Sequence, residues 1–134
     1  MSALTVSPLL RFALRLDGVV SFGAGVAASF ECASLEGVLG APARVIFAVG
    51  IFMLAYGAAI GWLATRPRID QRLVWGVVVG NLVWAVASSL LAGSGWFSPA
   101  TLGRALILGQ AVAVAGFAAL QYLGLGQSRA LALA

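Results

Sequence analysis

The sequence contains no histidine, and its only cysteine is Cys32. Without histidine the chain lacks the usual haem ligand, the most common metal ligand and the most common general base. A single cysteine cannot form a disulfide bond within the chain. We also find no phosphate-binding loop, no paired cysteines and no metal-ligand spacing. We therefore expect no cofactor, no metal site and no enzymatic activity, although chemistry based on carboxylates alone stays open.

Charge is also scarce, because only 9% of the residues are charged, against about 25% in an average soluble domain. Lysine is absent, so eight arginines against four acidic residues give the net charge of +4. A nucleic-acid-binding protein gathers such charge on one folded face. Here the arginines stand at the ends of apolar stretches, which favours contact with lipid headgroups and excludes nucleic acid as the expected partner.

Long uncharged stretches fill the rest of the chain. Between Arg44 and Arg66 lie 21 uncharged residues, between Arg72 and Arg104 lie 31, and between Arg104 and Arg129 lie 24. About 20 apolar residues are enough for a helix to cross a bilayer core of roughly 30 Å. A fourth stretch, from Leu16 to Phe30, is interrupted only by Asp17. We therefore predict one all-α domain over residues 1–134. Its four spans are predicted at about 8–35, 43–64, 73–92 and 99–124.

Local signals set these boundaries. Ser7-Pro8 and Ser98-Pro99 each combine a hydroxyl cap with proline at the first helical position, and Asp70 is a second type of cap. The first span would hold 28 residues, about 42 Å at 1.5 Å per residue, so we expect it to tilt or protrude. The polar residues at 31–32 make a poor cleavage site, so the first stretch is interpreted as a retained span.

The distribution of arginines predicts the orientation. With four spans, one side of the membrane carries Arg11, Arg15, Arg66, Arg68, Arg72 and Arg129, and the other carries Arg44 and Arg104. Cytoplasmic loops are enriched in arginine and lysine. We therefore predict an antiparallel four-helix transmembrane bundle in a bacterial inner membrane, with both termini in the cytoplasm.

Polar side chains recur at helical spacing within three spans. The first span carries Asp17, Ser21, Ala24, Ala28 and Glu31 on one face, the third carries Asn81, and the fourth carries Gln110 and Gln121. A buried polar group in lipid needs a protein partner. We expect these faces to meet, with Asp17 contacting Arg15, Asn81 or Gln121. The group is either hydrogen-bonded glue between helices, a polar cleft for a small ligand or protons, or a surface for another membrane protein.

Small residues form a second pattern. Gly57 and Gly61 in the second span and Gly76 and Gly80 in the third are each four residues apart, at matching distances from the loop that joins the spans. Such motifs allow close packing of helices. We predict that they pack this hairpin together, with dimerisation through one of them as the alternative.

Three short motifs resemble a known group of proteins. They are Arg15-Leu16-Asp17-Gly18, Gly80-Asn81-Leu82-Val83-Trp84 and Gln121-Tyr122-Leu123-Gly124-Leu125. Together they resemble small bacterial four-span integral membrane proteins of uncharacterised function. The general shape is similar to that of the DoxX-like four-helix membrane proteins, by analogy of architecture only. Small multidrug transporters are of similar size, but they place a glutamate well inside their first helix, whereas Glu31 lies near the far end of the first span.

The leading functional hypothesis is a small non-enzymatic membrane protein, structural or accessory, that associates with itself or with a larger complex. The alternative is a small-molecule binder or transporter that uses the polar faces of the first, third and fourth spans. The sequence names no ligand and no partner.

Overall fold

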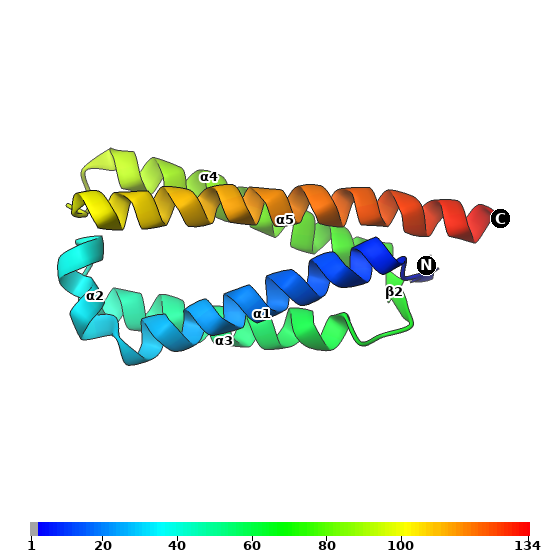
Figure 1. Cartoon of the computed structure of the whole chain (residues 1–134), viewed down its shortest axis with the longest axis horizontal. Coiled ribbons are helices and arrows are strands. Elements are labelled where there is room, and N and C mark those ends of the chain that lie inside the picture. Colours follow the sequence, from blue (N-terminus) through cyan, green and yellow to red (C-terminus); the bar gives the residue numbers. More distant parts are fainter. Residues whose placement is uncertain (1–2) are drawn as a thin grey trace.

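A computed structural model describes residues 3–134 and shows a helical protein (Figure 1). In chain order the elements are β1 (Ala3–Thr5), α1 (Pro8–Phe30), α2 (Cys32–Leu39), α3 (Ala43–Leu63), β2 (Arg68–Asp70), α4 (Gln71–Ser94) and α5 (Thr101–Leu133). The helices α3, α4 and α5 are long and apolar enough to cross a membrane, and α1 with α2 adds a fourth span if the bent pair is counted as one. These lengths and compositions support a multi-pass membrane protein.

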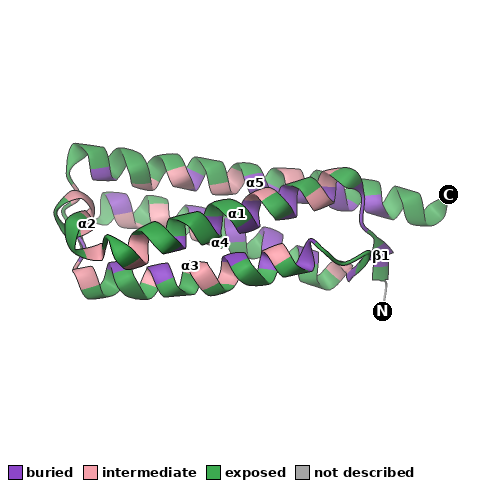
Figure 2. Ribbon diagram, turned by 60° about the horizontal axis from the view of Figure 1, so that its bottom comes forward, coloured by how far each residue is buried: buried purple, intermediate pink, exposed green. Residues whose placement is uncertain are grey.

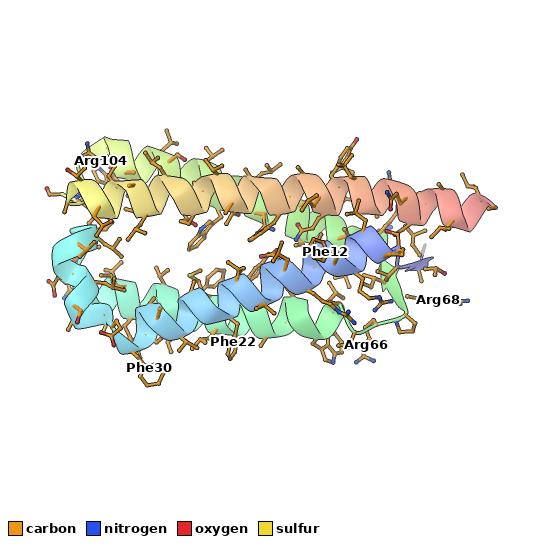
Figure 3. The ribbon with its side chains drawn as sticks, in the orientation of Figure 1. Phe12, Phe22, Phe30, Arg66, Arg68 and Arg104 are labelled. Carbon is orange, nitrogen blue, oxygen red and sulfur yellow. The ribbon has the colours of Figure 1, made fainter. Side chains whose placement is uncertain are left out.

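The four long helices run along one common direction, with α1 beside α3 and α4 beside α5 (Figure 1). Both chain termini and β2 lie at one end, which we call the terminal end, and α2 lies at the other, the α2 end. Phe12, Phe22 and Phe30 of α1 are 57%, 46% and 82% exposed, and Phe22 and Phe30 point away from the bundle in Figure 3. Exposed phenylalanines on an isolated chain are the surface that lipid tails would cover.

The predicted caps form at two helix starts. Ser7 accepts a hydrogen bond from the Leu10 N–H at 3.2 Å and is followed by Pro8, and Asp70 accepts one from the Arg72 N–H at 2.9 Å. Gly95 ends α4 in the left-handed conformation, with a φ of 79°. The Ser98-Pro99 start is wrong, because α5 begins at Thr101 behind Ala100, which has no side-chain cap.

The first span differs most from the prediction. Instead of continuing to residue 35, α1 ends at Phe30, and α2 leaves Glu31 at an angle of 97°. Neither glycine nor proline stands at residues 30–32, so no local signal marks the break. The contacts of α2 explain it, since α2 lies against α3 and α5, and its Val38 carbonyl accepts a bond from the Ala100 N–H at 3.0 Å.

The last helix runs past the predicted end at residue 124 as far as Leu133. Its added turns are fixed to the start of α1. The Ser128 hydroxyl, which is fully buried, accepts a bond from the Ser7 N–H at 3.0 Å, and the Ser7 hydroxyl donates to the Gly124 carbonyl at 2.8 Å. These buried bonds stabilise the helix where the sequence suggests only a short tail.

A two-stranded antiparallel ribbon closes the terminal end. Leu4 of β1 lies opposite Ile69 of β2, and both side chains are buried. The Val6 N–H extends the pairing to the Pro67 carbonyl at 3.2 Å. Strands of three residues are too short to show an alternating pattern, so the sequence did not predict them.

The main apolar core lies in the terminal half of the molecule. It consists of Leu4, Val6, Leu10, Leu14, Ile60, Leu63, Ala64, Ile69, Val74, Val77, Val78, Ala118 and Leu125. Toward the α2 end the inner faces are more open, since Ala24 is exposed, Ala28 is half-buried and α2 has no buried residue (Figure 2).

Close glycine packing joins α1 to α3 and not, as predicted, α3 to α4. A Cβ built on Gly57 would lie 2.5 Å from the Phe22 nitrogen, and one built on Gly25 would lie 2.8 Å from the Gly50 carbonyl oxygen. In contrast, a Cβ built on Gly61, Gly76 or Gly80 would meet no atom within 4 Å. Between α3 and α4 stand large aromatic rings, with Phe52 and Trp84 stacked at 5.9 Å, which keep these two backbones apart.

Replacing Gly57 by alanine should therefore destabilise the fold. The added methyl group would overlap the backbone of α1, and overpacking of this kind lowers the free energy of unfolding by about 1–3 kcal/mol. The matched control is Gly76→Ala, which adds the same methyl group to an exposed site with no neighbour. Both free energies are measured by denaturant titration in mild detergent. Equal stability of the two variants would show that α1 and α3 are not in close contact at Gly57.

Candidate functional site: a buried carboxylate and an adjacent pocket

Four long helices meet at one carboxylate. Asp17 of α1 is fully buried, and side chains from α1, α3, α4 and α5 surround it. We call this group the Asp17 cluster, and its members are Asp17, Ser21, Tyr56, Asn81 and Gln121. Four of these five residues were predicted to converge from their helical spacing, and the structure brings them together.

The two oxygens of Asp17 accept four hydrogen bonds. Oδ2 accepts from Gln121 Nε2 at 2.7 Å, from Asn81 Nδ2 at 2.8 Å and from the Tyr56 hydroxyl at 3.0 Å. Oδ1 accepts from the Ser21 hydroxyl at 3.0 Å. Hydrogen bonds to an ionised acceptor are roughly twice as strong as neutral ones. This geometry therefore satisfies a carboxylate that has no access to water.

The donors are also linked to one another. Asn81 Nδ2 donates its second hydrogen to Gln121 Oε1 at 3.1 Å, which fixes the orientation of both amides. The Tyr56 hydroxyl lies 2.9 Å from Asn81 Oδ1 as well as 3.0 Å from Asp17 Oδ2. Because a hydroxyl has one hydrogen, Tyr56 can donate to only one of these two acceptors at a time. Tyr56 is thus the one donor of the cluster with a choice of acceptor.

No cation takes part in these contacts. All four donors to Asp17 are uncharged side chains. Arg15, which was considered as a partner, is exposed, and the Arg11 guanidinium donates instead to the Ala64 carbonyl at 2.6 Å. Residues 3–134 contain no group of three or more His, Cys, Asp or Glu side chains that could hold a metal ion.

Tyr56 was not included among the candidate residues. It is the only polar side chain in the inner turns of α3, so it forms no stripe that would indicate a buried face. A useful signal was its place beside Gly57, because the close approach of α1 and α3 at Gly57 brings the tyrosine hydroxyl within reach of Asp17.

Gln110 lies outside the cluster. Its Oε1 accepts a hydrogen bond from the Trp84 indole at 3.0 Å, and its Nε2 donates to the Ile107 carbonyl at 3.0 Å. Eleven residues separate it from Gln121, which is about 16 Å along a helix. Gln110 therefore orients Trp84 and does not contact Asp17. Glu31, at the other end of the predicted polar face, is exposed at the bend between α1 and α2.

A pocket of about 100 Å³ adjoins the cluster between α3 and α4. Its walls are formed by Ser21, Phe52, Met53, Tyr56, Gly80, Asn81, Trp84 and Val114. Three of these residues, Ser21, Tyr56 and Asn81, also bind Asp17 directly. The rings form a stack, with Phe52 at 6.2 Å from Tyr56 and 5.9 Å from Trp84 between centroids. The surface of the pocket is thus mostly apolar, and three of the residues that form it also bind Asp17.

Comparison with known proteins finds no matching family model, no matching curated protein and no matching solved structure. No relative supplies a residue role, so the function has to be inferred from the geometry of the cluster and from the surfaces around it.

The two replacements Asp17→Asn and Asp17→Leu should separate charge from hydrogen bonding. Asparagine can present its oxygen to the three donors at Oδ2 and its amide to the Ser21 hydroxyl, so we expect nearly unchanged stability. Leucine takes the acceptor away from the Ser21 hydroxyl and from Gln121 Nε2, whereas the Tyr56 hydroxyl and Asn81 Nδ2 keep Asn81 Oδ1 and Gln121 Oε1 as acceptors. The donors left without an acceptor should lower the free energy of unfolding by at least about 2 kcal/mol. Denaturant titration in detergent measures both. A leucine variant as stable as the wild type would mean that the cluster contributes nothing to the fold.

Proposed function

We propose that this chain is a small non-enzymatic protein of a bacterial inner membrane, a structural or accessory component that associates with itself or with a larger membrane complex. In this proposal α1, α3, α4 and α5 form an antiparallel four-helix transmembrane bundle, with both termini in the cytoplasm. The observation that carries the association is the outward face of α5.

Six of the eight residues that recur at regular spacing along that face are alanine or glycine. The face consists of Ala105, Gly109, Val112, Gly116, Ala119, Leu123, Gly126 and Ala130, and all eight are exposed. Their alternating steps of four and three residues give an average period of 3.5, the repeat of a helix that packs along another helix in a left-handed supercoil. Small residues let such helices approach closely in a membrane. An apolar groove between α4 and α5 borders this face, and Val112 belongs to both.

The Asp17 cluster fits a structural role in such a protein. Its carboxylate joins four helices, and its oxygens are occupied by protein donors. Interhelical hydrogen bonds of this kind contribute roughly 0.6–2 kcal/mol each in membranes. A cluster that holds one arrangement of helices keeps the α5 face in a fixed position for a partner.

The arginines support the proposed orientation. Arg66 and Arg68 lie at the terminal end, and Arg104 lies at the α2 end (Figure 3). Over the whole chain six arginines belong to the side of the termini and two to the other side. The positive-inside rule then places the terminal end in the cytoplasm.

A second candidate function is that of a small-molecule binder or transporter. The observation in its favour is the pocket of about 100 Å³ that opens beside the Asp17 cluster. Ionisable residues within membrane-spanning segments are rare, and they often mark substrate or ion pathways.

The orientation predicts the result of reporter fusions. A reporter active only in the cytoplasm should be active at residue 134 and inactive in the α4–α5 loop near Trp96. A reporter active only in the periplasm should give the reverse result. Reversed signals would refute the orientation, and equal signals at both positions would refute α5 as a single span between them.

Association through α5 predicts a particle larger than the 13.7 kDa monomer. Native mass spectrometry after gentle extraction from the membrane measures this mass. Gly116→Leu should release the monomer, because the larger side chain separates the packed helices. The matched control Ala55→Leu adds bulk at an exposed position of α3, away from the α5 face, and should keep the assembly. Monomeric wild-type protein, or an unchanged particle with Gly116→Leu, would contradict association through α5.

A further inference from the structure

The pocket beside the Asp17 cluster has an unbalanced negative charge close behind one wall. Ser21, Tyr56 and Asn81 line the pocket, and each binds an oxygen of Asp17. A single layer of neutral side chains therefore separates the pocket from the carboxylate. Charges interact strongly across such short distances where water is excluded. A positively charged guest would be attracted to this wall.

The aromatic side chains of the pocket lining suit the same kind of ligand. Phe52 and Trp84 stand nearly parallel, at an angle of 15° between their planes, and the Trp84 indole is held by its bond to Gln110. Faces of tryptophan, tyrosine and phenylalanine attract cations, most strongly when the cation has lost its water. An organic ammonium ion can lose its water at a lower cost than a metal ion, because apolar groups cover its charge.

The size of the pocket limits the guest. A cavity of about 150 Å³ in another protein accommodates benzene, which has six non-hydrogen atoms. A volume of about 100 Å³ then holds about four such atoms by the same scale.

Gly80 leaves an opening through which a ligand can enter the pocket. It lines the pocket, is exposed on α4, and has no atom within 4 Å of where a Cβ would stand. The absence of a side chain at this position leaves the side of the pocket between α3 and α4 open.

We propose that this pocket binds a compact organic ammonium ion of about four non-hydrogen atoms, held by the Asp17 charge and the rings of Phe52, Tyr56 and Trp84. The proposal rests on the second candidate function, that of a small-molecule binder, and names the chemical class of its ligand.

The test compares two probes of the same shape. Isothermal titration calorimetry measures the binding of isopropylammonium chloride and of 2-propanol to the purified protein in nonionic detergent, at constant ionic strength. The cation should bind at least about tenfold more tightly than the neutral alcohol. This factor corresponds to about 1.4 kcal/mol, which lies within the range of cation–aromatic attraction.

Two variants locate the site, each with a matched control. Asp17→Asn removes the charge and should remove the preference for the cation, whereas Glu31→Gln removes an exposed carboxylate of the same chain and should not. Gly80→Leu should fill the opening and abolish binding of both probes. Gly76→Leu adds the same side chain one turn away, outside the pocket lining, and should leave binding unchanged.

The possible outcomes test the ligand class separately from the small-molecule binder function on which it rests. Equal affinity for both probes would refute an ammonium site and leave a neutral binding pocket. No binding of either probe would refute both the ligand class and the binder function. Binding that survives Gly80→Leu would place the site elsewhere. If Asp17→Asn fails to fold, the Gly80 and Gly76 pair still decides the location, and the two probes still decide the role of charge.

Discussion

Because Asp17 carries a carboxylate into the interior of an apolar protein, every helix around it must supply a hydrogen-bond donor. A charged group cannot be left bare in lipid without a cost of several kcal/mol. The structure meets this requirement with Tyr56 from α3, Asn81 from α4 and Gln121 from α5. The relative positions of four helices therefore depend on two oxygen atoms.

The glycines determine how closely the helices can approach these oxygens. Gly18 directly follows Asp17, and Gly57 directly follows Tyr56, and their backbones are in contact between α1 and α3. The second contact between the same helices, at Gly25 and Gly50, is spaced seven residues along each chain. Gly80 of α4 directly precedes Asn81, but it makes no close helix contact. A Cβ there would meet no atom within 4 Å, and the pocket is open beside Asn81. The same cluster therefore adjoins both a close helix contact and an open pocket.

Much of this arrangement could be predicted from the sequence, and the failures have physical reasons. Hydropathy and length indicate helices that can cross a membrane, and helical spacing places Asp17 and Ser21 on one face. The break at Glu31 could not be predicted, because α2 is turned by tertiary contacts and not by a local breaker. The prediction that glycines pack α3 against α4 is wrong, because the close contacts join α3 to α1. Spacing along a helix identifies a face of small residues but does not identify the helix that this face contacts. Tyr56 was missed because a single polar residue has no periodicity.

A double-mutant cycle between Asp17 and Gln121 tests most directly whether one carboxylate holds the helices together. The stabilities of Asp17→Leu, Gln121→Met and the double variant are compared with the wild type by denaturant titration in detergent. The two residues are in direct contact at 2.7 Å, so their effects should not add, and a coupling of about 1–2 kcal/mol is expected. Once Asp17 is gone, Gln121→Met removes only the bond that Gln121 Oε1 accepts from Asn81, so it should lower the stability less than it does in the wild type. Additive effects would show that Gln121 acts independently of Asp17, and would contradict the account of a cluster built on this carboxylate.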